Sequence, residues 1–283
     1  MTETLVVTVA FNSADVLDDF CASLPAASER GFRLVIVENN SGEREATRDI
    51  ARRHSAQFVA LDQNLGYGGG ITAGLTQLAI SEDFILIANP DLVFHPGAID
   101  ALVDAAHRNP QAAAFGPQIL NVDGGVYPSA RQLPSLRNGI GHALFYRLWP
   151  SNPWTALYLQ ETNTSTERPA GWLSGACILI RRDVFDAIGG FDSTYFMYFE
   201  DVDLGARIGR AGWANMYVPS ALVTHRGAHS TSTSESAAMM IREHHRSAYT
   251  YLSRKYTGWY LAPLRLVVRG GLSFRSWWLT RRL

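Results

Sequence analysis

The segment Leu5-Val6-Val7-Thr8-Val9-Ala10-Phe11 is a continuous apolar run rich in β-branched residues, and it stops at Asn12-Ser13. A run without polar alternation is typical of a strand that is buried on both faces of a parallel sheet. Apolar residues then recur at helical spacing, at Val16, Leu17, Phe20 and Leu24. The segment therefore predicts a central strand that leads directly into a helix.

Three further apolar runs repeat this pattern along the first half of the chain. We expect strands at residues 32–37, 57–61 and 84–88, and residues 45–54 have a helical pattern. Polar residues follow the strands at their carboxyl ends, which is the edge where open α/β sheets bind ligands. Helical crossovers between the strands predict an α/β fold with a single Rossmann-like mixed sheet flanked by helices.

Composition indicates a globular chain of one large domain. The chain has 283 residues, of which 47% are hydrophobic and 18% charged. Cys21 and Cys177 lie in apolar contexts without metal-ligand spacing, so we expect reduced core residues and a reducing compartment. Neither a basic region before the first apolar run nor an apolar run of about 18 residues occurs. These features predict a protein that stays on the cytoplasmic side, without a spanning helix.

The end of the chain is strongly basic, although the whole chain has a net charge of only -1. From Arg242 onward, Glu243 is the single acidic residue, and the basic residues alternate with Trp, Tyr, Leu and Phe. Such a pattern is typical of a helix at a membrane surface. We therefore expect a domain at 1–230 and a basic, amphipathic helical extension at 231–283 that binds a membrane. A terminal helix packed on the domain is the alternative, and nucleic acid is disfavoured because no recognition motif accompanies the basic residues.

The segment Gly190–Leu204 places Glu200, Asp201 and Asp203 directly beside aromatic residues. Burial near rings and crowding of like charges both raise the pKa of a carboxyl group, which suits a general base. Acidic residues are also common in the first turn of a helix, and Asp203 has the spacing of an ion pair with Arg207. The cluster alone leaves both interpretations open.

Two loops in the first half have a composition that suits phosphate or metal binding. The glycine-rich segment Asn64–Gly70 follows a predicted strand and opens a helix, so its N–H groups could approach a phosphate or sugar closely. It lacks the spacing of a dinucleotide fingerprint. Asn89-Pro90-Asp91 places Asp91 after the strand 84–88, where a carboxylate could hold a hard cation. An Asx turn is the alternative for this second loop.

Taken in order, these motifs and others resemble family 2 glycosyltransferases, which have the GT-A fold. The resemblance covers roughly residues 4 to 230 and rests on the segments Val7–Asn12, Val37–Ser41, Asn64–Gly70, Asn89–Asp91, Trp172–Ala176, Gly189–Asp192 and Phe196–Leu204. Within the family, the Asn-Pro-Asp motif and the last segment are similar to those of bacterial rhamnosyltransferases. The basic C-terminal extension is similar to that of actinobacterial members that use a polyprenyl-diphosphate-linked N-acetylglucosamine.

The resemblance implies a role for each matching position. Asp201 would be the catalytic base, with Glu200 in support. Asp91 and His225 would bind a divalent cation, Mg²⁺ or Mn²⁺, although Asn89 departs from the family's Asp-x-Asp motif. The implied nucleotide-binding residues are Ala10, Asn12, Glu38, Asn64, Gly66 and Asn89, and the implied acceptor-binding residues are Trp172, Ser174 and Gly175. Arg131 could in addition reach a diphosphate.

The resemblance implies an inverting transfer of rhamnose from dTDP-rhamnose to the lipid-linked acceptor in cell-wall linker synthesis. The enzyme would act as a peripheral protein at the cytoplasmic face of the plasma membrane. Its alternatives are another nucleotide-sugar donor and polysaccharide acceptor, or a non-catalytic sugar-nucleotide-binding protein. A nucleotidyltransferase is disfavoured because the residues after the first strand, Ala10–Asp15, contain no glycine-rich basic loop. The oligomeric state stays open.

Overall fold

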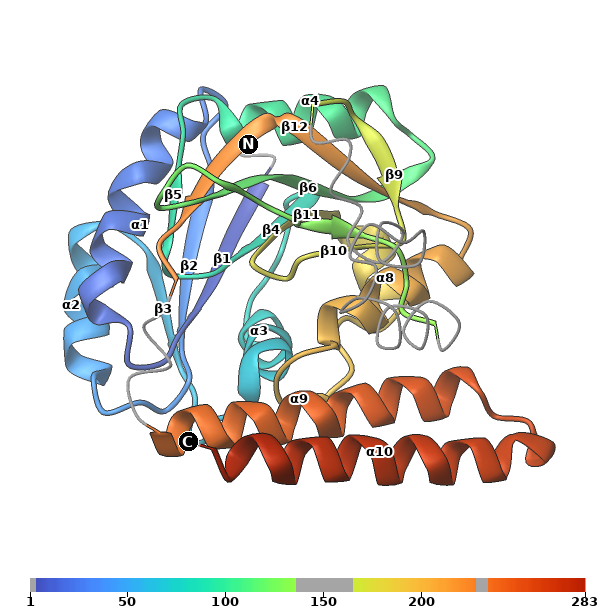
Figure 1. Ribbon diagram of the computed structural model, residues 1–283. Helices are drawn as coiled ribbons and strands as arrows, with labels where there is room; N and C mark the ends of the chain where they lie inside the picture. The colour runs from blue at the N-terminus through green and yellow to red at the C-terminus, as the bar shows by residue number, and fades with distance from the viewer. Residues whose placement is uncertain (1–3, 136–164, 228–233, 283) are drawn as a thin grey trace.

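The computed structural model describes residues 4–135, 165–227 and 234–282. A mixed sheet of ten strands runs through the molecule, helices cover both of its faces (Figure 1), and two further strands, β8 and β10, form a separate two-stranded sheet. The strands are β1 Thr4–Ala10, β2 Arg33–Glu38, β3 Gln57–Ala60, β4 Phe84–Ala88, β5 Leu92–Phe94, β6 Ala112–Asn121, β7 Val126–Tyr127, β8 Ala130–Arg131, β9 Arg168–Ala170, β10 Trp172–Leu173, β11 Cys177–Arg181 and β12 Ala214–His225. The helices are α1 Ala14–Ala27, α2 Arg44–Arg53, α3 Gly66–Leu75, α4 Ala98–Arg108, α7 Arg182–Ala187, α8 Glu200–Arg210, α9 Ser234–Lys255, the 3-10 helix η2 Trp259–Leu261, and α10 Ala262–Thr280.

The first half of the sheet has the expected parallel arrangement. β1 pairs in parallel with β2 on one side and β4 on the other, and β3 extends the order to β3-β2-β1-β4. After β3 the chain crosses back over the sheet, so that β4 is added on the other side of β1. Open α/β sheets bind ligands at such a switch point. The four strands predicted from apolar runs are confirmed, with ends displaced by one residue or none.

β11 joins this parallel half to the rest of the sheet. It lies between β4 and β6 and is antiparallel to both, and the order continues β6-β12-β5. The long strand β12 pairs in parallel with β6 and ends at His225. The twelve residues of β12 carry His225 to the same edge of the sheet as the end of β4.

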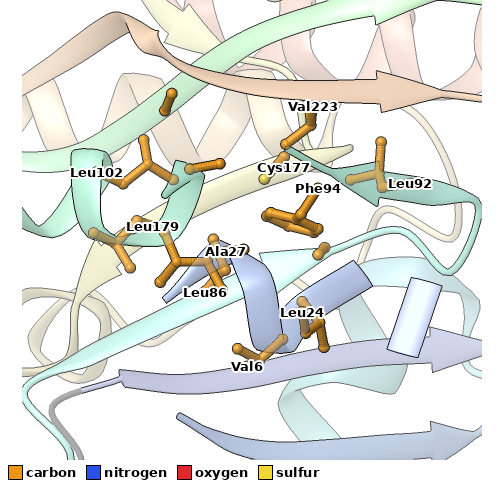
Figure 2. Packing of buried hydrophobic residues seen from close by; sticks show 14 of the residues in the cluster. Val6, Leu24, Ala27, Leu86, Leu92, Phe94, Leu102, Cys177, Leu179 and Val223 are labelled. Carbon is orange, nitrogen blue, oxygen red and sulfur yellow. The ribbon is translucent and has the colours of Figure 1, made fainter. Parts of the chain in front are cut away.

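Two apolar clusters fill the space between the sheet and its helices. On one face, strand residues such as Val6, Leu86 and Leu179 pack against Leu24 of α1 and Leu102 of α4 (Figure 2). Alternate residues of the same strands form a second cluster with α3, α7 and α8 on the other face. Burial of both faces explains why the central strands are apolar without interruption.

The two cysteines are buried, free thiols, as the sequence predicted. Cys177 belongs to the cluster in Figure 2. Burial raises the pKa of the Cys21 thiol to about 12, so this thiol is protonated and unreactive at neutral pH.

The C-terminal extension is a pair of helices that lie side by side along one edge of the molecule (Figure 1). α9 packs on the domain through Tyr251, which shares a small apolar cluster with Tyr195 and Val202. α10 packs mainly on α9 and has no buried residue. The predicted boundary at residue 230 falls at 228–233, outside the described residues. Across the described part of the chain, no helix is long and apolar enough to cross a membrane.

Candidate active site

The sequence-predicted catalytic, acceptor and metal residues come together where β4 ends and β11 begins. Ala88 and Cys177 are directly paired there, so the turn after β4 and the turn before β11 are neighbours. The N–H of Asn89 donates a hydrogen bond to the Ala176 carbonyl oxygen over 2.8 Å. This bond ties the predicted metal-binding turn to the predicted acceptor-binding turn.

Asp201 lies in the first turn of α8 and is held by two backbone N–H groups. Gly175 donates to its Oδ2 over 2.8 Å, and Val202 donates to its Oδ1 over the same distance. Burial raises the pKa of the Asp201 carboxyl group, and these N–H donors and the charge of Arg131 oppose that increase. The two N–H donors and Arg131 therefore all favour the ionised form of Asp201.

Glu200 lies beside Asp201 but has a different environment. It is 7% exposed. Among the described residues, no group donates a hydrogen bond to its Oε2 atom. Burial and then the charge of Asp201 raise the pKa of Glu200 to about 8. At neutral pH the pair therefore keeps its proton mainly on Glu200 and its negative charge on Asp201.

The two residues before this pair have a strained backbone. Tyr198 and Phe199 have φ angles of 65° and 66°, a left-handed conformation that bulky residues rarely adopt. The ring of His244 on α9 makes edge-to-face contacts with both rings, at centroid distances of 5.4 and 5.6 Å. Ser247 on α9 donates a hydrogen bond to the Met197 carbonyl oxygen over 2.9 Å.

The free energy that these contacts contribute is comparable to the cost of the strained turn. Each left-handed residue costs roughly 1–3 kcal/mol. Each ring contact contributes about 0.5–1.5 kcal/mol and the hydrogen bond about 1 kcal/mol. α9 therefore helps to maintain the turn that aims Glu200 and Asp201. Sequence reasoning missed this role of His244, because nothing in its local sequence identifies a partner 46 residues away at Tyr198.

The glycine-rich loop supports the same turn. A Cβ atom at Gly66 would lie 1.9 Å from the Phe196 carbonyl oxygen, and Gly66 has a φ of 73° that favours glycine. The Tyr67 N–H donates to that same Phe196 oxygen over 3.1 Å. The Tyr67 hydroxyl donates to the Gly175 carbonyl oxygen over 2.7 Å. The loop thus contacts both sides of the site, and its predicted contact with a phosphate stays a prediction.

The two predicted metal ligands are adjacent. His225 Nε2 lies 3.1 Å from Asp91 Oδ1, although the residues are 134 positions apart in the chain. A carboxylate and an imidazole are both ligands that Mn²⁺ accepts in proteins. Among residues 4–135, 165–227 and 234–282, including this pair, no group of three or more His, Cys, Asp or Glu side chains is arranged to hold a metal. A cation at Asp91 and His225 would need further ligands from a bound substrate.

Three of the predicted nucleotide-binding residues, Ala10, Asn12 and Glu38, lie at the ends of β1 and β2. Glu38 is fully buried, and its carboxylate accepts from the N–H groups of Asn40 and Ser41 and from Arg44. In this structure Glu38 therefore organises the turn after β2, and its contact with a base stays a prediction. Ala10 is buried beside it in the β1–β2 pairing.

Asn12 and Asn64 also shape the loops at this edge. The Asn12 Oδ1 accepts from the Gly42 N–H over 3.2 Å. The Asn64 Oδ1 accepts from Asn39 Nδ2 and from the Gly66 N–H, each over 2.9 Å. The amide oxygens of both residues thus stabilise the loops that surround the predicted nucleotide site.

The predicted acceptor residues lie on β10 and the turn that follows it. Trp172 Nε1 donates to the Gln132 carbonyl oxygen over 3.0 Å, which fixes the orientation of the indole ring. Ser174 is buried, and its N–H donates to the Ser129 carbonyl oxygen over 2.7 Å. The Asp203–Arg207 ion pair that the sequence predicted is present, with 2.6 Å between Oδ2 and Nε. Asp203 is therefore explained by a structural role.

The chain matches the family model described as glycosyltransferase like family 2 over residues 2–250. It belongs to the family 2 glycosyltransferases. The glycosyltransferase is 45% identical to an N-acetylglucosaminyl-diphospho-decaprenol L-rhamnosyltransferase of Mycobacterium tuberculosis, over 99% of this chain and 94% of the relative. It is 25% identical to a rhamnosyltransferase of Escherichia coli K12, over 88% of this chain and 92% of the relative.

A solved structure confirms the GT-A fold prediction for this glycosyltransferase. A mannosyltransferase from Pyrobaculum calidifontis, in complex with GDP-mannose and Mn²⁺, has a TM-score of 0.59 at 13% identity. The alignment covers 99% of this chain and 72% of that one. The roles of individual site residues in the present glycosyltransferase stay predictions.

We expect Glu200→Gln to reduce the pH dependence of stability between pH 5 and pH 8. Folding raises the pKa of Glu200 from its ordinary value of 4.5 to about 8. The folded state then binds more protons than the unfolded state in this window, so wild-type stability falls as pH rises. The Gln side chain does not titrate, and its variant should lose this part of the decrease.

Urea unfolding at several pH values measures the effect. Glu45→Gln is the control, because the Glu45 side chain is 72% exposed and should leave the wild-type slope unchanged. Parallel slopes for wild type and Glu200→Gln would contradict the assignment of the proton to Glu200.

Proposed function

We propose that this glycosyltransferase transfers L-rhamnose from dTDP-rhamnose to a polyprenyl-diphosphate-linked N-acetylglucosamine, with inversion. The observation that carries the proposal is the 45% identity, along almost the entire length of both chains, to the mycobacterial enzyme named as an N-acetylglucosaminyl-diphospho-decaprenol L-rhamnosyltransferase. The geometry adds a carboxylate at Asp201 that accepts two backbone N–H bonds, next to residues predicted to bind the acceptor. A carboxylate placed in this way favours an enzyme over a non-catalytic binding protein.

The chemistry requires one proton transfer and one exchange of bonds. The acceptor hydroxyl oxygen forms a bond to the anomeric carbon of the donor sugar, while the bond from that carbon to the nucleoside diphosphate breaks. Asp201 takes the hydroxyl proton as the new bond forms. Each oxygen of Asp201 accepts one backbone N–H bond, so each retains a lone pair for this proton.

Glu200 and Tyr67 act through Asp201 in this proposal. A neutral Glu200 adds no second negative charge beside the base, so the carboxylate pair carries a single charge before the proton transfer. Tyr67 holds the Gly175 carbonyl, and the Gly175 N–H holds Asp201. The orientation of the base thus depends on a chain of two hydrogen bonds.

Asp91 and His225 would hold a divalent cation, Mg²⁺ or Mn²⁺. The adjacency of one carboxylate and one imidazole fits such an ion, and diphosphate oxygens of the donor would complete its ligands. When bound, the cation would offset the negative charge that develops on the departing nucleoside diphosphate. Asn89 contributes its N–H to the Ala176 carbonyl, so the turn has a structural use for this residue besides metal binding.

The proposal also includes a peripheral location at the cytoplasmic face of the plasma membrane, through α10. Leu266, Phe274 and Trp277 recur at helical spacing on this helix and are 68%, 66% and 48% exposed. Arg269 and Arg275 lie among them, and α10 contains no acidic residue. Exposed apolar side chains interleaved with arginine are suited to the interface of an anionic bilayer.

We expect Asp201→Asn to lower turnover by about two to four orders of magnitude, the usual contribution of a general base. The test is rhamnosyl transfer from dTDP-rhamnose to a diphospholipid-linked N-acetylglucosamine, beside a panel of other sugar nucleotides. Donor binding should be nearly unchanged, because Asp201 contacts the acceptor side. Asp186→Asn, an exposed substitution on α7, is the matched control. Preference for another sugar nucleotide would reject rhamnose, and near wild-type turnover of Asp201→Asn would reject the base.

We expect Asp91→Ala to raise the concentration of Mg²⁺ or Mn²⁺ needed for half-maximal activity by more than about tenfold, since even outer groups at metal sites affect affinity this strongly. Activity is titrated with each ion after chelator treatment. Asp123→Ala, in the exposed turn after β6, should leave the titration unchanged. The same ion dependence in Asp91→Ala and wild type would assign the cation to other ligands.

Removal of the chain after Lys255 is expected to abolish co-sedimentation with anionic liposomes and to raise the KM for the lipid acceptor. Several arginines near an anionic surface each contribute about 1 kcal/mol, and α10 supplies exposed apolar side chains besides. A water-soluble acceptor should be used as before, because α9 and its contacts with the catalytic turn are retained. The double variant Phe274→Ser/Trp277→Ser, which changes only exposed side chains, should weaken binding in the same direction. Undiminished liposome binding by both variants would show that α10 has only a packing role.

A further inference from the structure

We propose that Arg131 binds the diphosphate of the lipid-linked acceptor and thereby positions the acceptor sugar over Asp201. The proposal rests on the proposed function, because it takes a diphosphate-linked sugar as the acceptor. It adds a binding group for the part of the acceptor that does not react.

Arg131 has a fixed position beside the predicted acceptor residues. β8 pairs with β10 so that Arg131 lies directly opposite Trp172. Its guanidinium group lies 5.5 Å from the ring centroid of Tyr127 and 5.6 Å from that of Trp172. Its Nε donates to the Pro128 carbonyl oxygen over 2.7 Å. Ring contacts and this hydrogen bond hold the planar group in one orientation.

The outer edge of this guanidinium group is available for a ligand. Across residues 4–135, 165–227 and 234–282, no hydrogen bond or ion pair involves its two terminal nitrogens. Arg168 provides a contrast in the same region. Its guanidinium lies 5.1 Å from the Tyr217 ring, but a terminal nitrogen donates to the Ala130 carbonyl oxygen over 3.2 Å. An oriented guanidinium with free donors is the group that proteins use to bind phosphate oxygens in a bidentate manner.

The relation between Arg131 and Asp201 suits an acceptor that spans both. Arg131 pairs with Trp172 on β10, and in the turn that follows β10 the Gly175 N–H donates to Asp201, so both side chains belong to the same site. The charge of Arg131 also lowers the pKa of Asp201. No ion pair joins them among the described residues, which leaves both free for a substrate. A reacting hydroxyl and a diphosphate on one sugar are separated by the width of that ring. Asp201 would then contact the hydroxyl while Arg131 contacts the diphosphate.

A nucleotide-sugar donor also contains a diphosphate, so the diphosphate at Arg131 could belong to the donor or to the acceptor. The donor diphosphate is expected at Asp91 and His225, which lie beyond the Gly175–Ala176 turn and close to the switch point between β1 and β4. Arg131 lies before that turn, on β8, which is the strand paired with β10. This placement favours the acceptor, and the experiment separates the two sources.

The test compares two N-acetylglucosamine acceptors with the same short lipid, one linked through a diphosphate and one through a simple glycosidic oxygen. We expect Arg131→Gln to raise the KM for the diphosphate acceptor by about 10- to 100-fold, the value of a charge-assisted hydrogen bond. The KM for the other acceptor and the KM for dTDP-rhamnose should stay unchanged. Arg131→Lys should retain the charge but lose the bidentate contact, giving an intermediate effect. Arg168→Gln is the matched control and should not change the ratio between acceptors.

Other outcomes would overturn the proposal in identifiable ways. An equal loss with both acceptors, together with a higher pH for half-maximal activity, would show that Arg131 acts only on the ionisation of Asp201. A raised KM for the donor would assign Arg131 to the donor diphosphate. Calorimetric titration with the diphosphate acceptor gives the same comparison without turnover. Absence of transfer by wild type would reject the proposed function, whereas unchanged acceptor binding by Arg131→Gln and Arg131→Lys would reject this inference alone.

Discussion

The hydrogen bond from the Gly175 N–H to Asp201 Oδ2 joins the parts of the site that come from different regions of the chain. Gly175 belongs to the turn before β11, and Asp201 begins α8. A Cβ atom at Gly175 would lie 3.3 Å from the Asp201 Cβ and 3.5 Å from a ring carbon of Tyr67. A Cβ atom at this position would therefore be tight against Asp201 and in ordinary van der Waals contact with Tyr67. The close approach lets one residue, Gly175, accept a hydrogen bond from Tyr67 through its carbonyl oxygen and donate one to Asp201 through its N–H.

The same turn explains how two adjacent carboxyl groups acquire different properties. Both Glu200 and Asp201 are shielded from water, which by itself favours the neutral form of each. Asp201 has N–H donors on both oxygens, while Glu200 has an oxygen without a donor among the described residues. Backbone hydrogen bonding thus decides which of the two groups is ionised. The α9 contacts with Tyr198 and Phe199 matter because they hold the start of α8 in the orientation that allows these bonds.

Local sequence patterns predicted β1 to β4 and the Asp203–Arg207 pair well, because each depends on residues close in the chain. β4 was predicted with both ends correct, since its apolar run is bounded by polar residues on both sides. Residue chemistry alone left the roles of Asp201 and Asp91 open, and the family resemblance supplied the predicted roles. Asp91 and His225 are adjacent in the structure, and their role in metal binding stays a prediction. The bonds that occupy Glu38 and the use of Gly66 against Phe196 could not be predicted, because both depend on where distant loops meet.

β11 connects the two halves of the sheet rigidly. Its residue Leu179 pairs with Leu86 of β4 on one side and with Phe115 of β6 on the other. The turn after β4, which carries Asp91, and the turn before β11, which holds Asp201 through the Gly175 N–H, are thus joined by the pairing of β4 with β11, and a hinge between them would have to break that pairing. The separation of Asp91 and Asp201 is accordingly fixed by this rigid framework. A sugar acceptor has to fit this fixed separation. Only the side chains and loops at the ends of the strands can adjust to the substrates.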